Sequence, residues 1–194
     1  MNHRNILRTK EAFLKVKTIE WEFSKGTFDN IDWFLMYSGS NAINYALEWA
    51  CFYGQIELVK KIVDKGGNAN ASNMSGLQMA SKNGHIDVVK WLLENGQMNN
   101  LPSWIILAEA VENNHTNIVE YLLMTNQYDI PWCDVRANED IAIRTAVESE
   151  NIDMVKLLIK FGANVNIFDG YCLSLANQKN NLELIKVIID AIND

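Results

Sequence analysis

A spacing of about 30 residues is the feature that most constrains how this chain can fold. Branched apolar residues recur at Val59, Val89 and Val119, at intervals of 30 residues. Val155 follows 36 residues later, and Ile185 a further 30. A fixed period between 20 and 50 residues is typical of a stack of like units, each of which buries its apolar face only against its neighbours. The spacing therefore predicts an elongated solenoid rather than one central core.

Each unit reads as two short helices. In the clearest copy, residues 76–96, the second half places four apolar residues on one helical stripe: Ile86, Val89, Leu92 and Leu93. Gly84 and Gly96 each follow a helical run. A left-handed cap at the end of a helix favours glycine at these positions. The pattern predicts helix, tight turn, helix and turn.

Two further positions keep the period. The first helix of each unit ends in a small residue: Ala50, Ala80, Ala110, Ala146 and Ala176. The turn after it carries Gly54, Gly84, Asn114, Glu150 and Asn180. Asparagine tolerates a positive φ angle, whereas glutamate does not favour one, so we expect an altered turn at Glu150. An ordinary bundle of amphipathic helices shares the 3.6-residue period, but it would not repeat these alanine and turn residues at fixed intervals.

We predict one all-α domain over residues 1–194, with short β-turn loops. Residues 1–40 form an N-terminal cap and a degenerate repeat, because terminal units of a solenoid are often atypical. Four repeats and a C-terminal capping repeat follow, at 41–70, 71–100, 101–136, 137–166 and 167–194. The segment 125–138 interrupts the 30-residue period and accounts for the 36-residue interval.

The composition argues against some classes of partner and indicates the cellular compartment. The net charge is −7, without a basic block, which argues against nucleic acid and against an anionic membrane surface. The chain has no apolar run long enough to span a membrane, and its start lacks the apolar stretch of a signal peptide. Its three cysteines lack CxxC spacing. Reduced thiols in the cytoplasm are expected.

Each unit resembles an ankyrin repeat, over nearly all of residues 20–194. The segments that carry the resemblance are Ala80 with 84–93, 54–60, 118–123, 155–158 and the loop 162–166. The T-P-L-H opening of the family is missing, and most units are shorter than its 33 residues. We therefore predict stubby turns in place of β-hairpin fingers. The Asn- and Ile-rich style is similar to ankyrin proteins of large DNA viruses of amoebae, which would imply a viral protein in the host-cell cytoplasm.

Residues that could carry chemistry have simpler explanations. His85 and His115 share the slot after the turn, without partners at metal-ligand spacing, so we expect each ring to bond locally at the start of its helix. Cys133 lacks a neighbouring base. Three aspartates lack the EF-hand register and are predicted to form turns or helix caps: Asp129, Asp134 and Asp140. No catalytic residue, cofactor or metal is predicted.

The candidate binding residues follow from the repeat geometry. First helices should line a concave inner side, with two solvent-facing residues before each turn: Phe52, Tyr53, Lys82, Asn83, Glu112, Asn113, Glu148, Ser149, Gln178 and Lys179. Two adjacent aromatic residues cannot both enter one helical stripe, so we expect Phe52 or Tyr53 to be exposed as an anchor. The alternative is that both pack against the irregular first repeat.

The insertion 125–138 offers a second set of candidates: Tyr128, Trp132 and Arg136. Long irregular loops are often functional. The alternative is that Trp132 folds back and covers the gap between two repeats.

The resemblance implies a non-enzymatic module that presents its inner face to an unidentified protein partner, as a monomer. We expect Phe52→Ala with Tyr53→Ala to weaken binding while leaving the melting temperature nearly unchanged. A second hypothesis is an adaptor that recruits host ubiquitin-ligase machinery, although no segment of that kind fits after Asp194. An enzyme is the least favoured alternative, because no site constellation is present.

Overall fold

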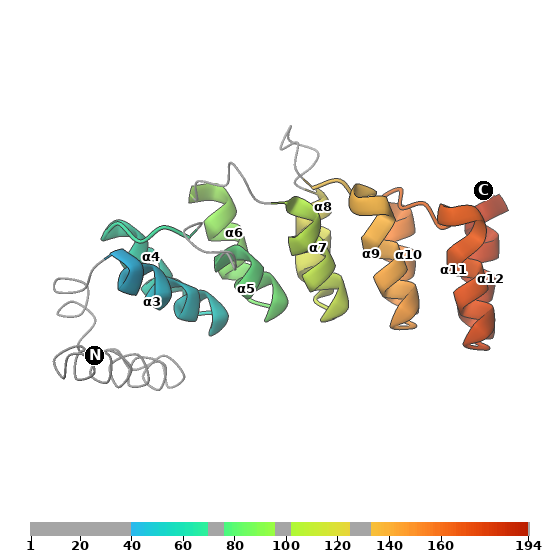
Figure 1. Cartoon of the computed structure of the whole chain (residues 1–194), viewed down its shortest axis with the longest axis horizontal. Helices are drawn as coiled ribbons and strands as arrows, with labels where there is room; N and C mark the ends of the chain where they lie inside the picture. The colour runs from blue at the N-terminus through green and yellow to red at the C-terminus, as the bar shows by residue number, and fades with distance from the viewer. Residues whose placement is uncertain (1–39, 70–75, 96–101, 125–132, 194) are drawn as a thin grey trace, which may run out of the picture.

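The computed structural model describes residues 40–69, 76–95, 102–124 and 133–193, and every regular element within them is an α-helix. This confirms the predicted all-α class. The helices are α3 (Ser40–Phe52), α4 (Ile56–Asp64), α5 (Gly76–Lys82), α6 (Ile86–Asn95), α7 (Ser103–Glu112), α8 (Thr116–Met124), α9 (Ala137–Glu148), α10 (Ile152–Lys160), α11 (Ile167–Gln178) and α12 (Leu182–Asn193). Five helix pairs follow one another along the long axis of the molecule (Figure 1).

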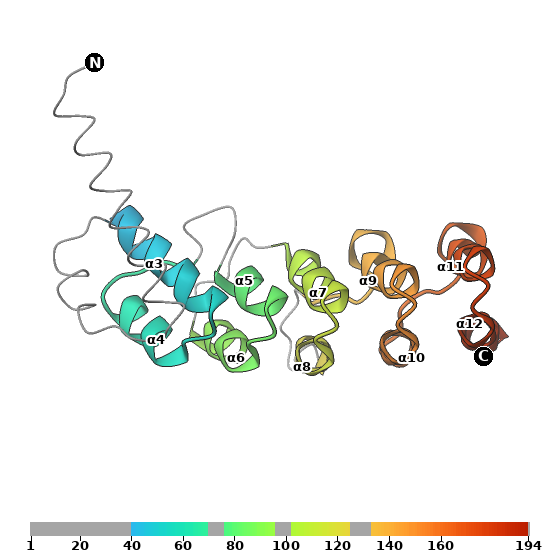
Figure 2. The ribbon, with the colours of Figure 1, turned by 90° about the horizontal axis from the view of Figure 1, so that it is seen from below.

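The pairs form two layers. Figure 2 shows the first helices α3, α5, α7, α9 and α11 in one layer and the second helices α4, α6, α8, α10 and α12 in the other. Each first helix packs against the first helix of the next pair and against its own second helix. The contacts are therefore between neighbours in sequence, as expected for a solenoid.

The two periodic columns lie at the centre of this stack. The five alanines that recur with the repeat, from Ala50 to Ala176, are fully buried. Val59, Val89, Val119 and Val155 are also fully buried, whereas Ile185 is only half-buried. Within the described residues no helix pair follows α12, so one side of Ile185 has no neighbouring repeat. Each fully buried valine stabilises the fold by roughly 1.5–3 kcal/mol.

The turn between the two helices has one geometry in all five pairs. Gly54 and Gly84 have φ angles of 69° and 81°, and Asn114, Glu150 and Asn180 have φ angles of 59°, 56° and 55°. The expectation of an altered turn at Glu150 is therefore wrong. Asn181 Nδ2 donates a hydrogen bond to Glu150 Oε2 at 2.9 Å, and Lys179 Nζ lies 3.5 Å from Oε1. Both groups belong to the next turn, and they hold the glutamate in the left-handed region.

The two histidines connect neighbouring repeats. His85 Nε2 donates to the carbonyl oxygen of Phe52 at 2.8 Å, and His115 Nε2 donates to that of Lys82 at 2.9 Å. Each ring thus reaches the preceding repeat rather than bonding locally, so that part of the sequence prediction is wrong. The structural role itself agrees with the prediction. A Cβ atom on Gly84 would lie 2.6 Å from His115 Cε1, which explains why glycine precedes histidine by one repeat.

The last two junctions use asparagine in place of histidine. Asn151 Nδ2 donates to Asn114 Oδ1 at 2.6 Å. Asn181 donates to Glu150 in the same way. Here the preceding turn residue supplies a side-chain acceptor, whereas the histidine junctions use a backbone carbonyl. The junctions between the five described repeats are therefore of two kinds, glycine followed by histidine and a polar residue followed by asparagine.

The loops after α4 and α10 are each tied to the first helix of their own repeat. Asn44 Oδ1 accepts from the backbone N–H of Asn68, and Asp140 Oδ1 accepts from that of Asn164, both at 2.8 Å. Asp134 accepts from the N–H of Arg136, two residues later, so it forms a turn as predicted. Asp140 is buried and bonds to the loop after α10 instead of forming a turn or a helix cap, so that part of the prediction is wrong. Asp129 lies outside the described residues.

The loop between α10 and α11, residues 161–166, is a short turn without a strand, as predicted. The loops at 70–75, 96–101 and 125–132 lie outside the described residues. Residues 138–140 in α9 and 168–170 in α11 have left-handed dihedral angles. Regular right-handed helix therefore begins after these residues in the last two repeats.

All three thiols are buried, so we expect them to resist modification in the folded chain. Burial raises the pKa of Cys133 to about 12 and that of Cys172 to about 11, and it also raises the pKa of Cys51. Since thiolate is the reactive form, Ellman's reagent at pH 8 should label the native protein far more slowly than the urea-unfolded protein. Rapid labelling of one thiol in native buffer would contradict its burial.

The raised pKa values of the thiols also make the stability of the folded state depend on pH. Because the thiol pKa values are raised above the ordinary value of 9.0, the folded state binds the thiol protons more tightly than the unfolded state. The resulting stabilisation is complete below about pH 9 and is lost as the pH rises above it.

Candidate protein-binding face

The solvent side of the first helices α3, α5, α7, α9 and α11 is called here the inner face. Its N-terminal end is aromatic. Trp49 and Phe52 lie in α3, and Tyr53 directly follows it; Phe52 and Tyr53 come three and four residues after Trp49, so the three rings share one side. Trp49 meets the ring of Phe52 edge-on, with centroids 5.5 Å apart, and stacks on that of Tyr53 at 5.7 Å. The rings hold one another in fixed positions.

The sequence predicted that Phe52 or Tyr53 would be exposed, but neither residue is, so this expectation is wrong. Both are half-buried, because the ring of each packs on that of Trp49 in α3. Tyr53 also packs against the core. The most exposed aromatic residue of α3 is Tyr45, with 51% of its surface open.

A hollow of about 210 Å³ lies beside this cluster. Its lining comes from α3 and α5: Tyr45, Glu48, Trp49, Phe52 and Met79. The lining is mostly apolar, with one carboxylate at its edge. A hollow of this kind fits an aliphatic or aromatic side chain better than a charged group, because burying an unpaired charge is costly.

In the next three repeats of the inner face, the residues that occupy the position of Phe52 are charged. Lys82 is exposed and lies 3.4 Å from Glu109 Oε2 in the next repeat. Glu112 is exposed. Glu148 accepts a hydrogen bond from the Tyr171 hydroxyl at 2.9 Å, and this bond raises the pKa of Tyr171. The face thus changes from aromatic to acidic along the stack.

The second residue of each predicted pair mostly ends its own helix. Asn83 Nδ2 donates to the carbonyl oxygen of Met79, Asn113 Nδ2 to that of Glu109, and Ser149 Oγ to that of Thr145. Carbonyl groups at the end of a helix lack intrahelical partners, and side chains can satisfy them. These residues therefore already have a local structural role.

Of the candidates in the insertion, only Arg136 is described. Its side chain is exposed, and its Nε lies 3.6 Å from Asp140 Oδ1 at the start of α9. Tyr128 and Trp132 lie outside the described residues, so whether the insertion binds a partner stays a prediction.

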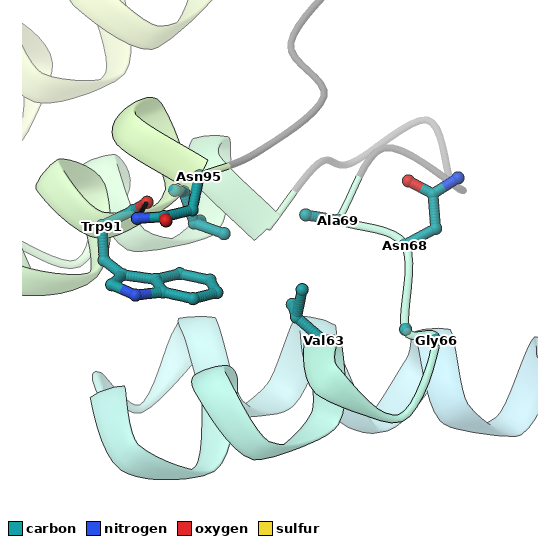
Figure 3. Close-up of a pocket in the computed structure, with 8 residues that line it drawn as sticks. Val63, Gly66, Asn68, Ala69, Trp91 and Asn95 are labelled. Carbon is teal, nitrogen blue, oxygen red and sulfur yellow. Dashed lines mark hydrogen bonds between the residues drawn. The ribbon is translucent and has the colours of Figure 1, made fainter.

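A second hollow, of about 350 Å³, lies between the second helices α4 and α6, away from these candidates. Figure 3 shows the Trp91 ring directed toward Val63 across this hollow, with Asn95 above it. Asn95 Nδ2 donates to the carbonyl oxygen of Trp91 at 3.1 Å. The lining has no charged residue, so we assign it no chemistry.

Sequence reasoning named Phe52 but missed Tyr45, Trp49 and Met79. The spacing of Tyr45, Trp49 and Phe52, at four and then three residues, could have identified one aromatic side of α3. Met79 lies in the next repeat, and no local pattern connects it to the others. Only the stacking of α5 on α3 brings it to the hollow.

The described residues form no other kind of candidate site. There, no three His, Cys, Asp or Glu side chains are grouped so that they could hold a metal ion. None of the described helices has both the length and the apolar character needed to cross a membrane.

Comparison with known proteins identifies the repeats. The family model described as ankyrin repeats (3 copies) matches residues 23–103, 47–132 and 107–194. A search of curated proteins found none that matches this sequence. The three overlapping matches cover most of the chain and agree with the helix pairs of the structure. The chain belongs to the ankyrin repeat family.

Proposed function

We propose that this protein is a non-enzymatic binding module that presents its inner face to a protein partner. Ankyrin repeats are generally protein–protein interaction modules, which supports the class. The observation that carries the proposal is the partly open aromatic cluster on α3, together with the hollow beside it. Aromatic residues in such positions are favoured anchors at protein interfaces.

The stack suits this role because it holds the inner face rigid. Side chains on packed helices lose little further freedom when a partner binds, so the entropic cost of association is small. The bonds between turns fix neighbouring first helices relative to one another. Each repeat then contributes a small part of one continuous surface.

The structure suggests a better test than the pair Phe52 and Tyr53. Because Tyr53 packs against the core, Tyr53→Ala would also destabilise the fold. Tyr45 and Phe52 are not part of that packing, so Tyr45→Ala with Phe52→Ala removes the open side of the cluster. We expect this double variant to capture at least tenfold less of its specific partner, while its melting temperature changes by only a few degrees.

The measurement is quantitative affinity capture with the full chain as bait, in extract from the cells that express it. Met124→Ala with Ile189→Ala is the matched control, because both residues are large, apolar and exposed on the second helices α8 and α12, and neither is part of the core packing. Equal partner recovery by Tyr45→Ala/Phe52→Ala and by the unmodified chain would refute the inner-face assignment. Specific recovery of cullin-associated proteins would extend the module to a ubiquitin-ligase adaptor.

A further inference from the structure

The charges along the inner face are unevenly compensated. At Lys82, Arg144 and Lys179, the three cations described on this side, the positive charge is already engaged, that of Lys179 by Glu150 at 3.5 Å. Lys82 faces Glu109 at 3.4 Å. Arg144 donates from Nε to the carbonyl oxygen of Glu139 at 2.9 Å and lies over the ring of Phe168. None of the three forms an ion pair with the remaining carboxylates in the middle of the face.

Two of those carboxylates lack a cationic partner among the residues that the structure describes. Glu112 ends α7, and its side chain is exposed. Glu148 ends α9 and accepts one hydrogen bond, from the neutral hydroxyl of Tyr171. They occupy the same position in consecutive repeats, so they form a short acidic row. Glu48, at the edge of the hollow, adds a third negative charge near the aromatic end.

The repeat geometry sets a spacing for any partner that crosses this row. Packed helices lie about 8–10 Å apart, and an extended chain advances about 3.3 Å per residue. A segment running along the inner face therefore passes one repeat about every three residues. From the hollow between α3 and α5, it reaches Glu112 after about four residues and Glu148 after about seven.

We propose that the inner face binds an extended, basic segment of a protein partner. An apolar side chain of this segment enters the hollow between α3 and α5, and lysine or arginine residues about four and seven positions away lie opposite Glu112 and Glu148. Charge complementarity selects the basic segment, and the apolar lining selects its anchor. This inference rests on the proposed function and specifies the chemistry of the partner.

The test uses the full chain and fluorescein-labelled peptides. The probe peptide has one leucine, with arginine about four and seven residues after it and glycine and serine elsewhere. The comparison peptide has glutamate in place of both arginines, and both peptides are also made with the sequence reversed. Affinities are measured by fluorescence anisotropy at low ionic strength, where surface charges are least screened.

We expect the arginine peptide to bind about three- to tenfold more tightly than the glutamate peptide, because exposed ion pairs contribute modestly. In the variant Glu112→Lys/Glu148→Lys this preference should reverse. Its matched control is Glu94→Lys/Asp190→Lys, which changes the net charge equally but on the second helices α6 and α12, where both residues are exposed. The control should keep the preference for arginine, and circular dichroism should show equal helicity in all variants.

The outcomes separate this inference from the function on which it rests. Equal binding of the arginine and glutamate peptides, or no binding of either arginine peptide, would overturn the inference that the partner segment is basic. If the captured partner is still lost in Tyr45→Ala/Phe52→Ala, the inner face remains the binding surface and only the proposed partner chemistry is wrong. An equal loss of preference in the second-helix control would show a nonspecific charge effect and would also overturn the inference.

Discussion

Replacing Gly84 with alanine is expected to lower the free energy of unfolding by about 2–3 kcal/mol, a large share of the stability of a typical domain. Gly84 has a φ angle of 81°, and holding alanine in the left-handed region costs roughly 1–2 kcal/mol. The new Cβ atom would also lie 2.6 Å from His115 Cε1. The ring must then move away from the Lys82 carbonyl oxygen, which forfeits a hydrogen bond worth about 1 kcal/mol.

Gly162→Ala is the matched control for this change. Gly162 has a similar φ angle of 91°, but a Cβ atom there would meet nothing within 4 Å. It should therefore incur the backbone cost alone, roughly 1–2 kcal/mol. Urea unfolding followed by circular dichroism measures both variants. Equal losses at the two glycines would show that the contact with His115 contributes nothing to stability.

Because the two kinds of junction use different residue pairs, a second substitution should restore part of the stability that a substitution at Gly84 removes. Gly84→Asn with His115→Asn recreates the pairing of Asn114 with Asn151, whose side chains meet at 2.6 Å. We expect the double variant to be about 1 kcal/mol more stable than Gly84→Asn alone, a coupling that a double-mutant cycle isolates. If the two substitutions are simply additive, the pairing of turn residues between repeats carries no energy.

The second large effect is expected at Ala110, the middle member of the alanine column. Ala110 is fully buried in α7, which packs on α5 on one side and on α9 on the other. Leucine at this position forces the helices apart and should lower the free energy of unfolding by about 2–3 kcal/mol. Ala108→Leu is the control, because Ala108 lies on the same helix but is only half-buried. Its effect should be about 0.5 kcal/mol or less.

A defect in the central repeat should also change how the protein unfolds. Each repeat is stabilised mainly by its two neighbours, so a weakened middle repeat uncouples the two ends of the stack. Thermal unfolding of Ala110→Leu should therefore broaden or divide into two transitions, while Ala108→Leu keeps the shape of the unmodified protein. A single sharp transition at lower temperature for Ala110→Leu would contradict this coupling.

The candidate site was only partly predictable from the sequence. The repeat register placed Phe52, Lys82, Glu112 and Glu148 at one equivalent position, and the structure places all of them on the first helices. Local sequence did not show that Tyr53 packs against the core or that Lys82 pairs with Glu109. The packing of Tyr53 and the ion pair of Lys82 both depend on where a side chain lies relative to other residues in the folded chain. The spacing of the repeats does not specify this.

The sequence by itself determined the helices, their order and the buried columns, because these depend on periodicity over short distances. A 3.6-residue stripe selects the buried side of each helix, and the constant interval aligns the alanine and valine columns. The tertiary structure alone decided the contacts between repeats. His85 and His115 bond to the preceding repeat, and Glu150 keeps the ordinary turn because Asn181 in the next repeat holds its carboxylate. Such bonds join residues about 30 positions apart, and stacking must form before either partner can reach the other.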